Sequence, residues 1–354
     1  MTTTVLLTTV AEGTGKTVVS LALATAARDR GLTAGYMKPK GTRLESVVGK
    51  TLDTDPVLAR EVLDLDAELE VLEPVVYSPT FVEQAIRGRE DPSALRASVR
   101  ERFESLAADR DLMVVEGGGT LETGRVVELA DPAVADLLDA AALLVVEYDQ
   151  PGDIDRILTA ADRFGDAMAG VLFNAVDEPV YDRLEADVIP FLERQGVPVV
   201  GVLPRVTALA GVTVADLAEQ LNAERLAGPP GDAYVERFIV GAMGADTSLR
   251  YFRRTKDAAL ITGGDRAEIQ SVALEAPGIK CLVLTGGVHP SNAILAKADD
   301  RGVPVLLVQP DTMSTIDRAE AVVSAGRTPD ADAVDRMRAL LAEHADVEAL
   351  LGAE

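Results

Sequence analysis

The stretch TVLLTTVAEGTGKTVVS, residues 4–20, decides the fold. Its first part is a short apolar run that predicts a β-strand over residues 4–9, and its last part begins a helix with apolar residues at helical spacing. Between the two lies EGTGKT. Glycines let backbone N–H groups point at a phosphate, a lysine reaches the β- and γ-phosphates, and the next Ser/Thr hydroxyl holds Mg²⁺. The stretch therefore predicts a phosphate-binding loop between a strand and a helix.

The loop departs from the G-x-x-x-x-G-K-[ST] pattern only at its first position, which holds Val10. That position sets where the loop leaves the strand, so we keep the prediction of a loop that binds ATP and Mg²⁺. A glycine-rich turn with a surface lysine is the alternative. The candidate nucleotide-binding residues of the loop are Glu12, Gly13, Thr14, Gly15, Lys16 and Thr17, and Lys16 is also a candidate catalytic residue.

Continuous apolar runs alternate with helical patterns through the rest of the first half. The runs are TAGYMKP (33–39), DLMVVEGGG (111–119), AALLVVEYD (141–149), AGVLFNAV (169–176) and VPVVGVLP (197–204). Apolar runs without alternation are typical of parallel strands that are covered on both faces. With right-handed crossovers they predict an α/β fold, a doubly wound and mostly parallel sheet of the P-loop NTPase type.

The second half predicts a further, smaller α/β unit. Gly and Pro crowd in NAERLAGPPGDA, residues 222–233, which predicts a linker, and four more apolar runs follow it. The end of the chain predicts a helical tail. We place the first domain at residues 1–206, the second at 207–325 and the tail at 326–354.

Two helix starts are predicted from their capping residues. Asp55 is followed by Pro56, which favours Asp55 as an N-cap. Thr80 and Glu83 have the spacing of a capping box.

Two acidic residues are candidate Mg²⁺ ligands beside Thr17. Glu116 ends an apolar strand, and a carboxylate at the carboxyl end of a parallel strand faces the ligand crevice. Gly117 and Gly118 follow it and let the backbone approach a bound group, although a plain turn is the alternative. Asp55 is the second candidate ligand, and a helix cap explains it equally well.

Lys38 and Lys40 lie just after the second strand and are two of only seven lysines in the chain. We predict that they bind a carboxylate or another anion at the crevice, with Lys38 as a candidate catalytic residue and Lys40 among the cofactor-binding residues. Asn174 ends a later strand, where a nucleotide base would lie, and a turn asparagine is the alternative.

Composition excludes several classes of partner. The net charge is −24 at pH 7 and acidic residues are spread along the chain, so nucleic acid and acidic membrane surfaces are not expected partners. No apolar run is long enough to span a bilayer. The lone cysteine, Cys281, indicates the cytoplasm, because it cannot build a disulfide framework. Dispersed acid with scarce lysine favours a salt-rich cytoplasm, and an ordinary acidic protein is the alternative.

The first ~210 residues resemble the dethiobiotin synthetase family of P-loop proteins and the N-terminal domain of long bacterial phosphotransacetylases. The motifs that carry this resemblance are, in order, EGTGKT, GYMKP, DPVLA, VVEGGG, FNAV and GVLPR. The resemblance implies ATP and Mg²⁺ at Lys16 and Thr17, metal ligands at Asp55 and Glu116, and a substrate contact at Lys38. It also implies base contacts at Asn174 and Pro204. Ala11 stands where the family has an aspartate, so the biotin-pathway substrate does not carry over.

The second half resembles the DRTGG family through GGDRAEIQ and CLVLTGG. The resemblance implies a regulatory domain that binds a ligand through Asp265, Arg266, Thr285, Gly286 and Gly287. Purely structural turns are the alternative at these positions.

Long phosphotransacetylases continue into a catalytic domain, which this sequence lacks, so we do not expect transacetylase activity. The leading hypothesis is an ATP- and Mg²⁺-binding regulatory or sensor protein, with slow ATP hydrolysis left open. The alternatives are an ATP-dependent ligase that activates a carboxylate or carbamate on a small anionic metabolite, and a scaffold that works without nucleotide. Relatives of this kind imply a homo-oligomer, with a dimer as the expected form.

Overall fold

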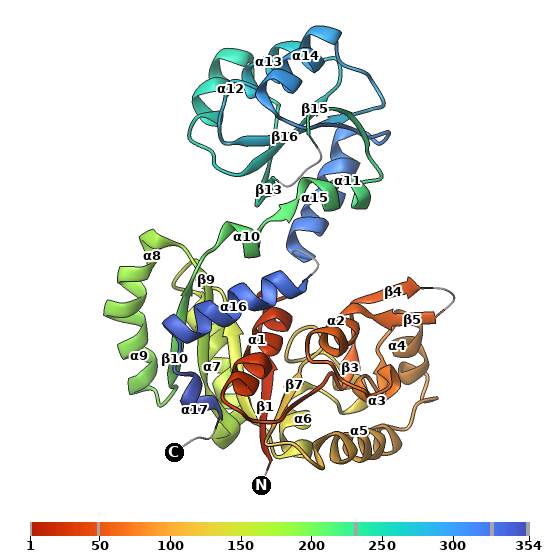
Figure 1. The fold of residues 1–354 in the computed structure, drawn as a ribbon, viewed down its shortest axis with the longest axis vertical. Coiled ribbons are helices and arrows are strands. Elements are labelled where there is room, and N and C mark those ends of the chain that lie inside the picture. The colour runs from red at the N-terminus through yellow and green to blue at the C-terminus, as the bar shows by residue number, and fades with distance from the viewer. Residues whose placement is uncertain (1, 48–49, 230–232, 326–328, 352–354) are drawn as a thin grey trace. The chain divides into compact units, whose positions relative to one another are not determined.

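The computed structural model describes residues 2–47, 50–229, 233–325 and 329–351. The chain divides into two compact units, which are described separately: unit 1 is Met1–Arg205 with Pro329–Glu354, and unit 2 is Val206–Thr328 (Figure 1). The chain thus leaves unit 1 after its sixth sheet strand, forms unit 2, and returns to complete unit 1 with two helices.

Unit 1 is built on a six-stranded sheet in the order β10-β9-β8-β1-β7-β2, in which every neighbouring pair is parallel. Its strands are β1 (Thr3–Thr8), β2 (Ala34–Met37), β7 (Leu112–Glu116), β8 (Ala141–Val146), β9 (Met168–Val176) and β10 (Val199–Pro204). The chain runs from β1 to β2 on one side and later to β8, β9 and β10 on the other, so the strand order reverses at β1. Ligands of such sheets bind outside the carboxyl ends of the strands at this point of reversal.

Helices cover both faces of this sheet, and the predicted doubly wound, mostly parallel α/β fold is confirmed. Right-handed crossovers in opposite directions place helices on opposite faces, so the helix between β1 and β2 lies opposite those that lead to β7, β8, β9 and β10. The helices are α1 (Lys16–Asp29), α5 (Pro92–Ala107), α6 (Asp131–Leu138), α7 (Asp153–Phe164), α8 (Glu178–Arg183) and α9 (Ile189–Arg194).

The last helices of the chain belong to unit 1. Helix α16 (Ala331–His344) packs against α1 and β10, and its Met337 and Leu341 are buried (Figure 1). An isolated antiparallel bridge between Gly201 and Ala345 joins the end of α16 to β10, and α17 (Val347–Leu351) follows. The segment after unit 2 therefore adds α16 to the helical layer that contains α1.

A set of short elements lies between β2 and α5. They are β3 (Lys40–Gly41), β4 (Leu44–Val47), β5 (Lys50–Asp53), α2 (Thr54–Val62), α3 (Leu69–Leu72), β6 (Val75–Val76) and α4 (Pro79–Ile86). Strand β3 pairs with β6, and β4 pairs with β5.

Both predicted helix caps in this region are wrong. The N-cap of α2 is Asp53, whose carboxylate accepts from the Asp55 N–H at 2.9 Å, so Asp55 already lies in the first turn. The N-cap of α4 is Ser78, whose hydroxyl accepts from the Phe81 N–H at 3.1 Å, and Thr80 is inside the helix. In each case an equally good cap lies two residues earlier in the sequence and competes successfully.

Unit 2 has a five-stranded sheet in the order β12-β17-β16-β15-β14, in which only the edge strand β12 is antiparallel. Its strands are β12 (Glu224–Ala227), β14 (Arg237–Val240), β15 (Ala258–Gly263), β16 (Ile279–Thr285) and β17 (Val305–Leu307). The linker predicted at residues 222–233 is wrong, because part of that segment forms β12 of this sheet; residues 230–232 lie outside the described chain.

The sheet of unit 2 packs against an apolar layer on each of its two faces. Alternate strand residues pack on one face against α12 (Ala245–Phe252), α13 (Ala267–Ala273) and α14 (Asn292–Arg301). The other residues pack against α11 (Val214–Gln220), α15 (Thr312–Ala325) and the short pair β11 (Val212–Thr213) and β13 (Tyr234–Val235). A further turn of helix, α10, spans Thr207–Ala210. The predicted second, smaller α/β domain is confirmed.

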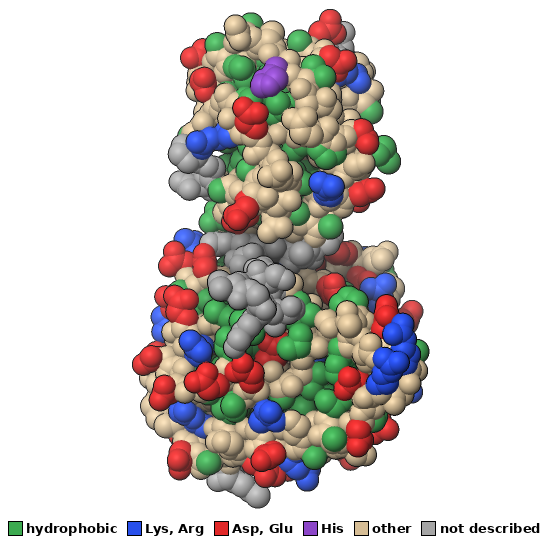
Figure 2. Space-filling model, turned by 90° about the vertical axis from the view of Figure 1, so that its right-hand side faces the viewer, with side chains coloured by type: hydrophobic (Ala, Val, Ile, Leu, Met, Phe, Trp, Pro, Cys, Tyr) green, Lys and Arg blue, Asp and Glu red, His purple; other side chains and the backbone are tan. Residues whose placement is uncertain are grey.

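Acidic and basic side chains are interspersed over the face drawn in Figure 2, as the dispersed charge of the sequence leads one to expect. Within the described ranges, every helix is too short or too polar to traverse a lipid bilayer.

Candidate functional site

The loop from Glu12 to Thr17 joins β1 to α1 at the carboxyl edge of the sheet. Gly13 and Gly15 both have a φ of +77°, a conformation that glycine adopts without strain and that turns successive N–H groups into the loop. Val10, the residue that departs from the usual pattern, packs against the apolar core of unit 1. The departure at Val10 is therefore a packing feature, and Gly13 and Gly15 keep the backbone conformation that the loop pattern calls for.

Asn174 of β9 meets this loop directly. Its Nδ2 donates to the carbonyl of Thr14 at 2.9 Å, and a methyl group on Gly15 would lie only 2.7 Å from that nitrogen. Asn174, which the sequence predicts beside the nucleotide base, thus contacts the loop backbone in the structure. Pro204 ends β10, which is separated from β1 by β8 and β9, and Glu12 is exposed.

Lys16 and Thr17 open helix α1 and are both buried. The Lys16 ammonium donates to the carbonyl of Gly119 at 2.7 Å, and the Thr17 hydroxyl donates to Glu116 Oε1 at 2.7 Å. Burial lowers the pKa of Lys16, against the attraction of Asp131 and Glu116. The loop and the glycine turn after β7 are therefore joined by two polar contacts.

Glu116 lies at the centre of a buried polar cluster. Its second oxygen, Oε2, accepts from the Tyr36 hydroxyl at 2.8 Å. Burial and then repulsion by Asp55 raise the pKa of Glu116 to about 7, against the attraction of Lys38 and Lys16.

Lys38 lies between the carboxylates of this cluster. Its ammonium contacts Asp55, lies 2.7 Å from Asp53 Oδ2 and is 3.9 Å from Glu116 Oε1. Burial opposes the charge, but the three neighbouring carboxylates outweigh it and hold the pKa of Lys38 above its usual range. The pKa of Asp55 is lowered, because Lys38 and Arg43 outweigh the effect of its burial.

The predicted Mg²⁺ ligands form an oxygen donor set. Asp55 Oδ1 is buried without a hydrogen-bond partner, and the Thr17 hydroxyl and the Glu116 carboxylate complete the set. Such a hydroxyl and carboxylate set suits Mg²⁺, which keeps its remaining positions for water and phosphate oxygens. In the described part of the chain no group of three or more His, Cys, Asp or Glu side chains is arranged to hold a metal, so the fit rests on two carboxylates and one hydroxyl.

Lys40 is buried and forms an ion pair with Asp131, at 2.5 Å between Nζ and Oδ1. The other oxygen of Asp131 accepts from the Thr8 hydroxyl at 2.6 Å. The backbone of Gly117 and Gly118 lies against this pair: a methyl group on Gly117 would be 2.1 Å from Asp131 Oδ2, and one on Gly118 would be 2.2 Å from the Lys40 carbonyl oxygen.

Sequence reasoning missed several residues of this cluster, namely Thr8, Tyr36, Asp53, Glu73 and Asp131. One signal was available. Asp131 stands before a proline at the start of a helix, as Asp55 does, and both aspartates reach the same edge of the sheet. Glu73 is mostly buried beside Asp53, whose N–H donates to it at 3.2 Å. Burial and then repulsion by Asp53 raise the pKa of Glu73 to about 7.

In unit 2, the two glycine turns expected to bind a ligand follow the neighbouring parallel strands β15 and β16. Asp265 and Arg266 are exposed on the first turn. Thr285 is buried and its hydroxyl lies 2.8 Å from that of Thr312, while Gly286 is exposed. Gly287 donates its N–H to the Val308 carbonyl at 3.0 Å. The structure thus brings the two predicted turns together.

Two further polar side chains lie beneath these turns. Gln270 donates to the carbonyls of Gly263 and Gly264 at 2.9 and 3.1 Å, and its Oε1 is buried without a partner. The Thr262 hydroxyl is also buried without a partner. Both were missed by sequence reasoning, because a buried amide and a strand threonine carry no local motif.

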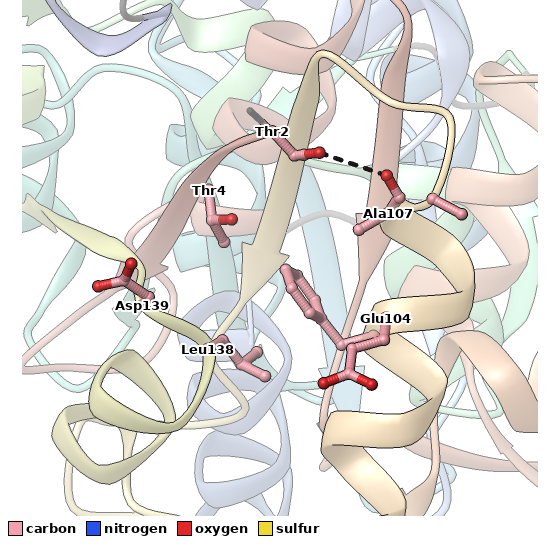
Figure 3. A pocket seen from close by; sticks show the side chains of 8 residues that line it. Thr2, Thr4, Glu104, Ala107, Leu138 and Asp139 are labelled. Atoms are coloured by element: carbon pink, nitrogen blue, oxygen red, sulfur yellow. Dashed lines mark hydrogen bonds between the residues drawn. The ribbon is translucent and has the colours of Figure 1, made fainter.

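An open depression of about 340 Å³ lies at the amino end of β1 (Figure 3). Its lining comes from β1, the end of α5 and the end of α6, and Thr2 there donates to the Ala107 carbonyl at 3.3 Å. The lining residues are Thr2, Thr4, Phe103, Glu104, Ala107, Ala108, Leu138 and Asp139. None of the residues singled out from the sequence lines it.

Two family models match the chain in succession, an AAA domain over residues 3–213 and a DRTGG domain over residues 216–322. An ATP-dependent dethiobiotin synthetase of Aromatoleum aromaticum is 31% identical over 213 residues, which cover 59% of this chain and 92% of that protein. A phosphate acetyltransferase of Haemophilus influenzae is 27% identical over 187 residues, 51% of this chain but only 25% of that protein.

A solved structure of the CBS and DRTGG domains of the regulatory region of Clostridium perfringens pyrophosphatase also matches, with 20% identity and a TM-score of 0.28, over 39% of this chain and 67% of that one. On the sequence matches, the chain belongs to the AAA domain family of dethiobiotin synthetase-like P-loop proteins, and it carries a DRTGG domain in addition. The resemblance read from the motifs is confirmed.

Proposed function

We propose that this protein is an ATP- and Mg²⁺-binding regulatory protein, in which unit 1 binds the nucleotide and unit 2 responds to it. Two hydrogen bonds carry the proposal. Lys16 donates to the carbonyl of Gly119, and Thr17 donates to the carboxylate of Glu116. The positive φ of Gly13 and Gly15, which the loop pattern calls for, supports the proposal further.

Each residue has a defined role in this proposal. The N–H groups of the loop bind the phosphates, and Lys16 exchanges the Gly119 carbonyl for a phosphate oxygen. Thr17, Asp55 and Glu116 would hold Mg²⁺, and the ion would neutralise phosphate charge. Lys38 faces the same carboxylates and would supply a further positive charge for the phosphates.

The regulatory part of the proposal is supported by chain connectivity. Unit 2 is inserted between β10 and α16, and α16 packs against α1, the helix that begins with Lys16 and Thr17. Both ends of unit 2 are therefore continuous in the chain with unit 1, the unit that we propose binds the nucleotide. We propose that unit 2 binds a small anionic ligand at Asp265, Arg266, Thr285, Gly286 and Gly287.

The direct test is the affinity of the chain for ATP with Mg²⁺, measured by isothermal titration calorimetry. Because a charge-assisted bond contributes about 1.5–3 kcal/mol, Lys16→Ala is expected to weaken ATP by roughly 10- to 100-fold. The matched control is Lys280→Ala, a half-exposed lysine of unit 2 that pairs with Asp257, and it should bind ATP as the wild type does. Equal affinity in wild type and Lys16→Ala would end the proposal.

A second experiment tests the response of unit 2. Hydrogen exchange with and without ATP is expected to slow in α1 and α16 and to change within unit 2. Protection confined to the loop and α1 would leave a nucleotide-binding protein without the proposed regulation.

A second candidate function is an ATP-dependent ligase, and two observations favour it. The curated relatives include ATP-dependent dethiobiotin synthetases, and Lys38 and Glu116 lie beside the loop, where a substrate carboxylate or carbamate would be activated. Release of ADP on adding diamines or amino acids with bicarbonate would support this candidate. ADP release that no member of such a panel accelerates would exclude it for those substrates.

We also propose that the protein is a cytoplasmic homodimer adapted to high salt. The net charge of −24 supports the last point, because salt screens the mutual repulsion of the acidic surface. Light scattering measures the assembly. Thermal unfolding at rising KCl concentration tests the adaptation, and a melting temperature that falls between low and molar salt would contradict it.

A further inference from the structure

Lys40 and Asp131 form a buried ion pair to which the proposed function assigns no role. Both side chains are at most 1% exposed, and the Lys40 ammonium lies 2.5 Å from Asp131 Oδ1. Replacing a buried ion pair by apolar residues of similar size is often neutral or stabilising, so such a pair is weak evidence for a role in stability. Its contacts point to a different role.

The pair touches both segments of backbone that form the phosphate site. Asp131 Oδ2 accepts from the hydroxyl of Thr8, the last residue of β1 before the loop. On the other side, the turn after β7 lies on the pair, because Gly117 leaves no room for a methyl group against Asp131 and Gly118 leaves none against Lys40.

The turn held in this way supplies the carbonyl to which Lys16 donates. Gly119 follows Gly117 and Gly118 directly, and Lys16 Nζ lies 2.7 Å from its oxygen. The Leu121 N–H continues the link, since it donates to the carbonyl of Thr9 at 2.9 Å. The position of the Lys16 ammonium therefore depends on the turn Gly117–Gly119, and Asp131 and Lys40 pack against that turn.

We propose that Asp131, held by Lys40, is a positioning residue of the phosphate site: it fixes the distance between the end of β1 and the glycine turn, and so places Lys16 for the β- and γ-phosphates. This inference rests on the proposed nucleotide function. It adds a residue that contacts no phosphate itself and acts through Thr8, Gly117 and Gly118.

The test uses the double variant Lys40→Met with Asp131→Asn in the full chain. It removes one charge of each sign, so the net charge of the site stays the same. Because Lys16 reaches the β- and γ-phosphates and AMP has neither, ATP is expected to bind about tenfold or more weakly while AMP changes by less than about twofold. Calorimetry with Mg²⁺ measures both affinities, and urea unfolding checks that the variant folds. The matched control is Lys297→Met with Glu275→Gln, which removes an exposed ion pair of unit 2 and should change neither affinity.

Two results would overturn the inference while leaving the proposed function standing. One is a double variant that binds ATP as tightly as the wild type. The other is an equal loss for ATP and AMP, which would mean that the pair acts only through the amount of folded protein. A wild type that binds no ATP, or that is matched by Lys16→Ala, would overturn both proposals.

A second variant applies if the double variant does not fold. Gly117→Ala keeps both charges and places a methyl group 2.1 Å from Asp131 Oδ2, which pushes the turn away from the pair. The same selective loss of ATP over AMP is expected. Unchanged ATP affinity in folded Gly117→Ala would contradict the positioning role.

Discussion

The two units carry similar glycine turns at the carboxyl ends of parallel strands, but they differ in what lies beneath those turns. Unit 1 buries charged side chains there, namely Lys16, Lys38, Lys40, Asp53, Asp55, Glu73, Glu116 and Asp131. In unit 2, the buried polar side chains of the described residues are all uncharged, namely Ser248, Thr262, Gln270, Thr285 and Thr315.

This difference bears on the kind of ligand that the carboxyl edge of each sheet would bind. A buried charge costs several kcal/mol unless it is paired, and in unit 1 the buried lysines and carboxylates lie against one another, as Lys38 does against Asp53 and Asp55 and Lys40 against Asp131. In the proposed function, a charged ligand would exchange partners with these groups. The edge of unit 2 offers hydroxyls, an amide and exposed backbone at Gly286, with Asp265 and Arg266 at the surface. Such an edge suits a ligand that is bound mainly through hydrogen bonds.

The largest expected effect compares an aspartate of each unit. Asp131→Ala leaves Lys40 buried without its partner, and breaking such a pair costs about 3–5 kcal/mol of unfolding free energy. Asp265→Ala removes an exposed carboxylate and should stay within about 0.5 kcal/mol. Urea unfolding measures both. Similar losses in the two variants would break the comparison between the units.

A second pair compares threonine hydroxyls. Thr8→Val removes a bond to the charged Asp131, which is expected to cost about 1.5–3 kcal/mol. Thr262→Val removes a buried hydroxyl that has no partner, so its effect is expected between about zero and a small gain in stability. The comparison uses unfolding free energies at one pH, and a loss at Thr262 as large as that at Thr8 would contradict it.

The smallest effect concerns pH. The pKa of Glu73 is raised to about 7 in the fold, so its contribution is complete at acid pH and is lost as the pH rises through 7. Glu73→Gln keeps the neutral form at every pH. Relative to the wild type, the variant should therefore gain about 1–2 kcal/mol between pH 5 and 8, after allowing for solvent screening.

This prediction is checked by urea unfolding at several pH values. Glu83→Gln serves as the control, because that exposed glutamate pairs with Arg87 at the surface. Parallel stability curves for wild type and Glu73→Gln would show that Glu73 is ionised in the folded protein at neutral pH.

The sequence predicted the parts of the site that are local in the chain. The loop residues Lys16 and Thr17, and the strand end at Glu116, follow from short patterns whose chemistry is complete within a few positions. Lys38 was also predicted, although its partners in the structure are carboxylates of the protein.

The remaining contacts join residues that are far apart in the chain. Asp131 meets Lys40 across 91 positions and Thr8 across 123, and no periodicity within one segment encodes such a pairing. The prediction of Asp55 and Thr80 as N-caps was wrong for the opposite reason. Two good capping residues lie close together in each segment, and the earlier one, Asp53 or Ser78, caps the helix. Strand β12 was missed because Gly and Pro just after it predict a linker.

A crystal structure with Mg²⁺ and a non-hydrolysable ATP analogue tests the central claim most directly. The account predicts the triphosphate against the N–H groups of Gly13 and Gly15, with the Lys16 ammonium moved from the Gly119 carbonyl to a phosphate oxygen. A structure in which the analogue binds elsewhere, or in which Lys16 still donates to Gly119 beside a bound triphosphate, would contradict it.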